Sequence, residues 1–372
     1  MKNHSKTFTQ VSKQKSKRTM IEQGLNVVAG VDLGDKHSHL CLIDLDGNIV
    51  ERKKLRTSPA AFERSFGGWA AMRVVLEAGT HANWVYRLLG RLGHEPLMGD
   101  THRLALITQS LSKDDRTDAQ RLAELGLRMP GMLNAVEPCS LAIQCDRAVL
   151  KARETLVETR TKLINTVRGV VKSFGECLPA SSSEAFVKKA SPKVPDELRV
   201  ALGPLLEVIQ HVSDEIRRYD KHIEKLGAEK YPAAKRLRSI RGVGPVTALA
   251  FVLNLDNNPE RLRRSRDAGP RMGLRPKRRD SGERSLQLSI TKTGDRLLRR
   301  LLVQCSQYIL GYHGEDSDLR RWGLGLAARG GPTAKRKAIV AVARKLAVLL
   351  HVLWRQDVDF DPFYRTNSRT AV

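Results

Sequence analysis

The chain has 372 residues, which is enough for two or three domains. Its 65 Lys and Arg residues outnumber its 40 Asp and Glu residues, and the formal net charge of +25 favours a polyanionic partner, most commonly nucleic acid. We find no apolar run of about 18 residues, which argues against a membrane-spanning helix. The five cysteines form no CxxC pair, so we expect neither a zinc site nor a disulfide framework. They indicate a cytoplasmic protein whose cysteines are reduced.

Residues 1–25 form a basic, polar tail without the apolar segment of a signal peptide, and we expect them to be disordered. Short apolar runs then predict strands at 27–32, 40–45, 51–55, 72–76 and 96–98, with a hairpin turn at Asp46-Gly47-Asn48. Helical spacing predicts helices at 60–69, 82–92 and 119–127. Hairpin strands followed by strand–helix alternation predict an α/β domain with a mixed sheet over residues 26–135.

Residues 136–230 have a long, charged helical pattern. Two helices are predicted, at 141–174 and 196–226, with a turn and linker at 178–194 between them. The pair is either an antiparallel or dimerising coiled coil, or a plain two-helix connector packed on its own domains. Arginines recur between 147 and 168, where they either contact nucleic acid or form a solvated helix face.

Residues 231–356 are predicted to form an α-helical domain, followed by a tail at 357–372. The Arg241-Gly242-Val243-Gly244-Pro245 segment before an apolar helix is similar to a helix-hairpin-helix turn, whose glycine N–H groups can approach a phosphate closely. Residues 260–300 hold 14 Lys and Arg against 5 Asp and Glu, and apolar-striped helices are predicted at 297–310 and 334–354. Lys292, Arg296, Arg299 and Arg300 either contact a nucleic-acid backbone or form a solvated helix face.

Four carboxylates follow predicted strands or open a predicted helix. Asp32 and Glu77 end apolar strands, while Asp115 and Asp118 are three residues apart, a spacing that places both on one face of a helical turn. Converging carboxylates suit Mg²⁺, and two such ions can stabilise the attacking and leaving oxygens of a phosphodiester displacement. Each acid also has a simpler interpretation: Asp32 as a turn residue, and Asp118 as the N-cap of the following helix.

Three segments, GVDLGDKHSHLCLID, LEAGTHANW and SKDDRTDAQRLAEL, resemble the RuvC-like domain of the DEDD insertion-sequence transposases, which are relatives of the pilin-gene inversion recombinase. The stretches IRGVGPVTALAFV and GPRMGLRPKRRDSGERSLQLSITKTGDRLLRRLLVQC resemble the C-terminal transposase domain of that family. Two departures are the KDD sequence, which leaves Asp114 as a rival to Asp115, and Arg241, where proline is common. Spacing favours Asp115.

The resemblance implies a ribonuclease H-like (RuvC-like) fold, Mg²⁺ or Mn²⁺ at Asp32, Glu77, Asp115 and Asp118, and Ser281 as a nucleophile that forms a covalent 5′-phosphoserine intermediate with DNA. It further implies a homo-oligomer, a dimer of dimers in which the acids of one subunit work with the serine of another. The implied partners are DNA, at the element ends and target, and a structured bridge RNA that pairs with both. The protein would be bacterial, cytoplasmic and associated with the nucleoid.

Ser281 has no neighbouring histidine to activate it, so metal held by the distant acids is the expected activator. The basic residues around it are candidates to bind nucleic acid and to clamp the scissile phosphate: Arg275, Lys277, Arg278, Arg279, Arg284 and Lys292. Two alternatives stay open. Ser281 is a turn residue in a junction-cleaving nuclease that uses water, or the chain is a non-catalytic nucleic-acid-binding protein.

Overall fold

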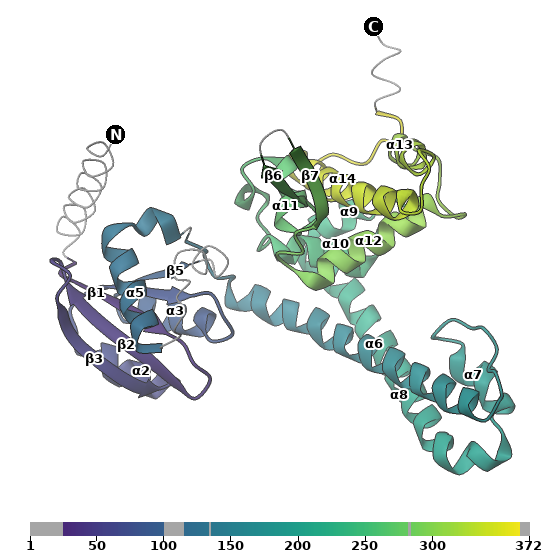
Figure 1. The fold of residues 1–372 in the computed structure, drawn as a ribbon, viewed down its shortest axis with the longest axis horizontal. Coiled ribbons are helices and arrows are strands. Elements are labelled where there is room, and N and C mark those ends of the chain that lie inside the picture. The colour runs from purple at the N-terminus through teal and green to yellow at the C-terminus, as the bar shows by residue number, and fades with distance from the viewer. Residues whose placement is uncertain (1–24, 100–114, 134, 282–283, 365–372) are drawn as a thin grey trace, which may run out of the picture. The chain divides into compact units, whose positions relative to one another are not determined.

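The computed structural model describes residues 25–99, 115–133, 135–281 and 284–364 (Figure 1). These residues form two compact units, and the chain passes from one to the other between Cys139 and Ser140. The predicted N-terminal tail up to residue 24 and the last eight residues lie outside the described part. Among the helices that are described, none combines the length and apolar character needed to cross a membrane.

A five-stranded mixed sheet is the centre of the first unit. Its strands are β1 (Val27–Asp32), β2 (His37–Asp44), β3 (Ile49–Arg56), β4 (Arg73–Glu77) and β5 (Glu95–Gly99). They lie in the order β3-β2-β1-β4-β5, and β1, β4 and β5 run parallel while β2 and β3 are antiparallel to their neighbours. The mixed sheet predicted from the sequence is therefore confirmed.

The hairpin between β2 and β3 forms at the predicted turn. The carboxylate of Asp44 accepts hydrogen bonds from the backbone N–H groups of Asp46 and Asn48, at 2.9 and 2.8 Å, and Gly47 adopts a positive φ of 95°. The β-strand that follows is longer than the predicted 51–55, because the apolar residues at 49 and 50 join the polar run as one strand. An edge strand needs little burial, so its polar half gave a weak pattern.

Helices cover both faces of the sheet. The helices α2 (Pro59–Phe66) and α3 (Ala82–Arg91) pack on one face, with a core that includes Phe62, Val74 and Leu88. The helix α5 (Asp115–Arg128) packs on the other face, over Val28 and Val75. Figure 1 shows this layered arrangement, which is ribonuclease H-like. Strand alternation explains it, because successive side chains of one strand enter opposite cores.

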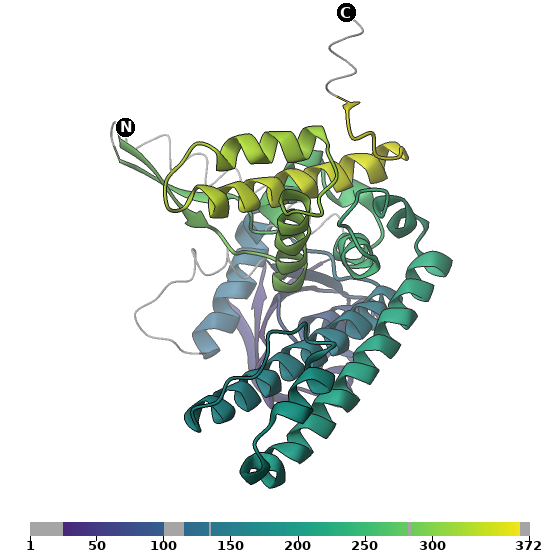
Figure 2. The ribbon, with the colours of Figure 1, turned by 90° about the vertical axis from the view of Figure 1, so that its right-hand side faces the viewer.

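Two long helices open the second unit. They are α6 (Leu141–Ser173) and α8 (Arg199–Lys230), which lie side by side in both ribbon views (Figure 2). Arg153 contacts Asp220 at 2.5 Å, and Asp146, nearer the start of α6, pairs with Lys230 at the end of α8. The two helices are therefore an antiparallel pair within one chain, one of the arrangements that the sequence left open.

The segment between α6 and α8 is folded, and the prediction of a linker at 178–194 was wrong in this respect. It contains the short helix α7 (Phe186–Ala190) and two 3₁₀ turns. Phe186 is 1% exposed and packs with Val194 against α6 and α8 in one apolar core. The serine- and proline-rich composition hid this packing, because only a few apolar residues in the segment are needed to fill the end of a two-helix pair.

The rest of the second unit is helical except for one hairpin. Its helices are α9 (Pro232–Leu237), α10 (Pro245–Asn254), α11 (Ala268–Arg271), α12 (Arg296–Leu310), α13 (Asp318–Ala327) and α14 (Ala334–Gln356). The strands β6 (Pro276–Ser281) and β7 (Arg284–Ile290) form a two-stranded antiparallel sheet, which the expectation of an all-helical domain had missed. The residues of β6 are polar and basic and show no apolar alternation, whereas β7 does alternate, with Leu286, Leu288 and Ile290 two residues apart.

Candidate active site

Two of the predicted site residues come to one edge of the sheet because of strand order. The strands β1 and β4 are parallel neighbours, and Val31 pairs with Leu76. Asp32 and Glu77 are the next residues on each strand, so their backbones are about 4.8 Å apart in the hydrogen-bonding direction. Both side chains are partly buried. The carboxyl ends of the two strands therefore present neighbouring acids.

The helix α5 reaches the same edge because Gly30 has no side chain. A methyl group on Gly30 would lie 1.9 Å from the carbonyl oxygen of Ala119 and 2.5 Å from the backbone nitrogen of Ala123. Further along α5, Gly126 lies against Val28 and Val75. The helix therefore runs antiparallel to β1, with its N-terminus toward the carboxyl end of that strand.

This docking sets where the other two acids lie. Asp32 is two residues beyond Gly30, a rise of about 6.6 Å along the strand. That distance corresponds to about four residues of helix at 1.5 Å each. Counted back from the Ala119–Ala123 contact, it leads to positions 115–118. Asp115 and Asp118 thus belong to the end of α5 that lies toward the carboxyl end of β1.

The role of Asp118 as an N-cap is wrong. The helix α5 already includes Asp115, so Asp118 is the fourth residue of the helix and lies inside its first turn. The carboxylate of Asp118 contacts Arg121 at 3.4 Å, and its side chain is 28% exposed. Acids in a first turn also stabilise a helix through the macrodipole, so this position suits both a structural and a ligating role. Asp114, the rival third acid, lies outside the described residues.

The described side chains do not by themselves form a metal site: no three His, Cys, Asp or Glu residues among them are grouped closely enough. What the fold supplies is a donor set of the right chemistry at one place. Carboxylate oxygens are the ligands that Mg²⁺ prefers, and the ion commonly takes only one or two of them while keeping water and substrate phosphate as further ligands. Partly buried Asp32 and Glu77 at adjacent strand ends fit that pattern.

Two histidines belong to the same edge, and no sequence pattern had singled them out. His39 on β2 lies opposite Asp32 in the antiparallel register. His81, four residues after Glu77, accepts a hydrogen bond at Nδ1 from the Trp84 indole at 3.1 Å, and its Nε2 faces Asp35 at 3.6 Å. The signal that could have found them is that each follows a strand-ending acid in the chain, His39 by seven residues and His81 by four.

Ser281 is the last residue of β6 and lies in the second compact unit, whereas the four acids lie in the first. The register pairs Ser281 with Arg284 and Arg279 with Leu286. Gly282, part of the predicted Ser-Gly turn, lies outside the described residues. The serine thus ends a strand of a hairpin that carries several basic residues.

The basic residues of the predicted nucleic-acid site fall into two groups. In the β6–β7 region, the described cations have exposed side chains and no ion pair with another described residue: Arg275, Lys277, Arg278, Arg279 and Lys292. Arg300, by contrast, contacts the buried carboxylate of Glu154 at 2.9 Å, and Arg299 donates to the carbonyl oxygen of Thr293 at 2.7 Å. Arg299 and Arg300 hold the fold together and are not a free surface.

The arginines of α6 are also mainly structural. Arg153 and Arg160 contact Asp220 and Glu184 at 2.5 and 2.9 Å, and Arg147 contacts Asp295 at 3.5 Å. A hollow of about 440 Å³ between α6 and α12 is lined by charged residues that include Arg147, Glu154 and Asp295. The alternating charges of this helix therefore serve packing against its own unit.

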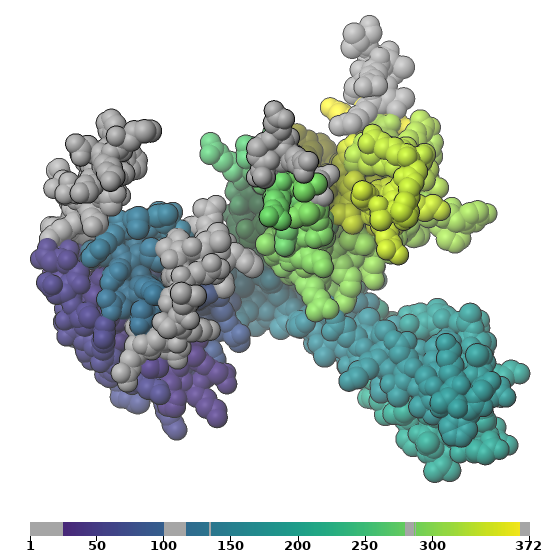
Figure 3. Space-filling view, viewed as in Figure 1, coloured from purple at the N-terminus to yellow at the C-terminus, as the bar shows by residue number. Residues whose placement is uncertain are grey.

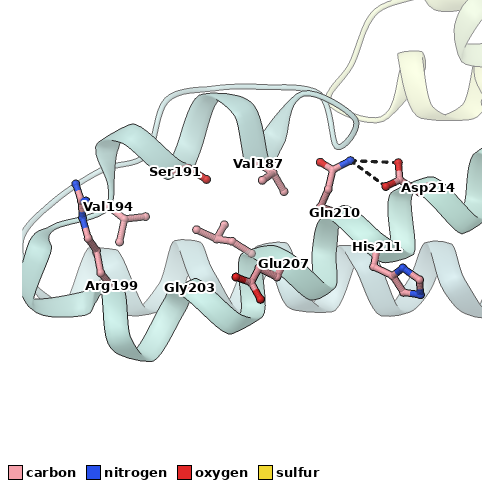
Figure 4. Close-up of a pocket in the computed structure, with 10 residues that line it drawn as sticks. Val187, Ser191, Val194, Arg199, Gly203, Glu207, Gln210, His211 and Asp214 are labelled. Atoms are coloured by element: carbon pink, nitrogen blue, oxygen red, sulfur yellow. Dashed lines mark hydrogen bonds between the residues drawn. The ribbon is translucent and has the colours of Figure 1, made fainter.

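A second hollow is not part of this site. It measures about 600 Å³ and lies between α7 and α8, with apolar walls that include Val187 and Val194 (Figure 4). At its rim the Gln210 amide donates to Asp214 at 3.2 and 3.3 Å. None of the residues predicted for catalysis lines it.

Comparison with known protein families gives two separate matches along the chain, and both matched families are transposases. Residues 29–175 match the DEDD family of IS110 elements, described as "Transposase", and residues 234–319 match the family described as "Transposase IS116/IS110/IS902 family". Together the two matches cover more than half of the chain. The first includes Asp32, Glu77, Asp115 and Asp118, and the second includes Ser281.

Full-length relatives carry the same name. The chain is 28% identical to the transposase for insertion sequence element IS1111A of Coxiella burnetii, over 88% of this chain and 89% of that protein. It is 28% identical to the transposase for IS1328 of Yersinia enterocolitica, over 89% and 97%, and 25% identical to a probable family 20 transposase of Pseudomonas aeruginosa, over 90% and 98%. The order of the two matched domains and the length of these alignments lead to one conclusion: the chain belongs to the IS110/IS116/IS902 family of transposases.

Proposed function

We propose that this transposase cuts and rejoins the DNA strands of an insertion sequence with a divalent-metal site at Asp32, Glu77, Asp115 and Asp118 and with Ser281 as the nucleophile. The observation that carries the proposal is the meeting of β1, β4 and the start of α5 at one edge of the sheet. Each of these three elements carries at least one of the acids, and the close packing of α5 on Gly30 supports the proposal.

The residues of the chain would divide the work. Asp32 and Glu77, on neighbouring strands, would hold Mg²⁺ or Mn²⁺, and positions 115 and 118 would complete the ligand set from α5. Such an ion would supply positive charge at the scissile phosphate and would favour loss of the serine proton. The exposed cations of the β6–β7 region, Arg278 and Arg279 among them, bind the non-bridging phosphate oxygens and disperse their charge.

The proposed chemistry is two transesterifications. In the first, the Ser281 hydroxyl oxygen bonds to phosphorus while the bond to the 3′ oxygen breaks, and the serine proton ends on that 3′ oxygen. This leaves a 5′-phosphoserine and a free 3′ hydroxyl. In the second, a 3′ hydroxyl of another strand attacks the same phosphorus, the serine–phosphorus bond breaks, and the proton returns to Ser281. The number of phosphodiester bonds is conserved, so no external energy source is needed.

The decisive variant is Ser281→Ala, with Ser289→Ala, an exposed serine of the same hairpin, as the matched control. Nicked DNA carrying an element end traps the covalent adduct, which is measured on a denaturing gel. We expect Ser281→Ala to lose both adduct and recombination and Ser289→Ala to keep them. Strand cleavage at full rate without adduct in Ser281→Ala would instead identify a nuclease that uses water.

The third acid is tested in the same assay. Asp115→Ala is expected to abolish adduct formation, whereas Asp114→Ala is expected to retain it. The reverse result would move the ligand to Asp114, and full activity of both variants would remove the helix from the metal site. Chelation of divalent ions is expected to stop adduct formation by the wild-type protein without dissociating the protein from DNA.

We also propose a homo-oligomer, a dimer of dimers, in which acids and serine come from different subunits. Support comes from the location of Asp32 and Ser281 in separate compact units of the chain. Mixing Asp32→Asn protein with Ser281→Ala protein is expected to restore part of the recombination, because a site can then draw intact acids from one subunit and intact serine from another. Sites built within one subunit would give no recovery.

The last part of the proposal is guidance by a bridge RNA that pairs with donor and target DNA. It is supported by the family and by the hairpin cations, which suit phosphate binding more than base reading. RNA transcribed from the flank of the element is expected to be required by the purified protein. Undiminished recombination at the same target after ribonuclease treatment would remove the RNA from the mechanism.

A further inference from the structure

The C-terminal helices carry an unusual charge distribution. From residue 319 to residue 356 the sequence contains nine Lys and Arg and no Asp or Glu. This stretch covers nearly all of α13, the turn that follows it, and the whole of α14. Both ribbon views show α13 and α14 packed together at the surface of their unit (Figure 2).

Several of the nine cations have partners within the chain. Arg321 contacts Asp316, Arg355 contacts Glu260 at 3.0 Å, and Arg320 donates to the carbonyl oxygen of Gly311 at 2.7 Å. Lys345 lies over the Trp322 ring, with 3.9 Å from its Nζ to the ring centroid. These cations are explained by the fold.

Four cations are different, and we call them the α14 basic patch. Their side chains are exposed and make no ion pair or hydrogen bond with any described residue: Arg329, Lys335, Arg336 and Lys337. They lie in the turn before α14 and in its first turn. The ninth cation, Arg344, is also exposed but lies further along α14, where its side chain passes close to Gly269, and it is not counted in the patch. In the space-filling view the lime segment that contains them is at the surface of the unit (Figure 3).

The patch lies where folding disfavours positive charge. The start of α14 has the positive end of the helix dipole, which favours acids over cations. The first turn of α14 contains no acid, and Thr333 makes no side-chain capping bond. On α8 of the same unit, by contrast, Arg217 and Arg218 each pair with an acid three residues earlier. The fold therefore gives no account of the α14 basic patch.

We propose that the α14 basic patch binds the phosphate backbone of duplex DNA at a place separate from the Ser281 hairpin. Four unpaired cations close together complement a polyanion, and each contact with a phosphate releases counterions, which increases the binding affinity. No acid of the stretch opposes them. Duplex DNA is the polyanion chosen because the chain is a transposase, so this inference rests on the family and on the proposed DNA reaction. Contacts from lysine and arginine to phosphates position DNA without selecting its sequence.

The test uses full-length protein with four substitutions, R329Q/K335Q/R336Q/K337Q. A matched control removes four equally exposed cations that already have acidic partners, R199Q/R217Q/R218Q/K225Q. Both variants lose the same net charge. Binding to a random-sequence duplex is measured by fluorescence anisotropy over a series of salt concentrations, and thermal unfolding shows whether each variant is folded.

We expect the patch variant to lose at least about tenfold in affinity. The slope of log K against log salt should become less steep by up to about 3.6, because each of the four phosphate contacts that the protein no longer makes contributes about 0.9 to the slope. The control is expected to keep most of the slope. Equal losses in both variants would show that affinity follows net charge alone and would overturn the proposal. Intact duplex binding with loss of single-stranded RNA binding would overturn the choice of DNA.

The result is separable from that of the proposed chemistry. Ser281→Ala is expected to bind duplex with an unchanged salt slope while forming no adduct. The patch variant is expected to form the adduct at low salt, where binding is saturated, and to lose it as salt rises. A patch variant with no adduct under saturated binding would place these residues in the reaction and contradict a role in DNA affinity alone.

Discussion

Gly30→Ala should damage the site without changing any acid. The added methyl group would lie 1.9 Å from the carbonyl oxygen of Ala119, whereas ordinary van der Waals contact begins at 3.4 Å. The helix α5 would have to retreat by about 1.5 Å, because its backbone cannot rotate away as a side chain can. Overpacking of this kind costs about 1–3 kcal/mol of unfolding free energy.

The displaced helix carries Asp115 and Asp118, so activity should fall more than stability. A misplacement of about 1 Å can cost about 100-fold in rate. Unfolding is measured by urea denaturation, and adduct formation is measured at a temperature where the variant is fully folded. The control is Gly90→Ala on α3, where an added methyl group meets nothing within 4 Å. The reasoning is refuted if Gly30→Ala is as stable and as active as that control.

Two further changes test the electrostatics of the first unit. Arg73 is buried, and its guanidinium donates to the Glu95 carboxylate at 2.9 and 3.2 Å and to the carbonyl oxygen of Gly126. Arg73→Ala should therefore lower the free energy of unfolding, measured by urea denaturation, by about 2 kcal/mol. A decrease below about 0.5 kcal/mol would contradict a stabilising bidentate pair. Burial lowers the pKa of His94 below its ordinary 6.5, so the unfolded chain takes up a proton more readily than the folded one as pH falls. The stabilisation from neutral His94 should be fully present above about pH 6.5 and should decrease below it. In His94→Gln the free energy of unfolding should depend less on pH between about pH 7.5 and pH 5. Equal pH dependence in both proteins would rule out this histidine as the cause.

The local signals of this sequence were strong wherever a residue pattern repeats over a short distance. Apolar runs ending in Asp32 and Glu77 marked β1 and β4, and helical spacing marked α6, α12 and α14. The three-residue spacing of Asp115 and Asp118 correctly indicated one helical turn. Local patterns failed for β6, whose polar and basic residues show no alternation, and for the tip around Phe186, where packing depends on distant helices. In β7 the alternating Leu286 and Leu288 were a usable signal that the prediction of a helical domain passed over.

The sequence by itself determined the strand-ending acids, the helix that carries two more, and the excess of positive charge. Only the tertiary structure decided that β1 and β4 are parallel neighbours, that α5 lies antiparallel on β1 at Gly30, and which cations are already paired. The physical reason is that strand order, helix docking and ion pairing join residues far apart in the chain, such as Arg300 and Glu154. Spacing along the chain carries no information on those partners, so the basic residues left without one, in the β6–β7 hairpin and at the start of α14, became visible only in the fold.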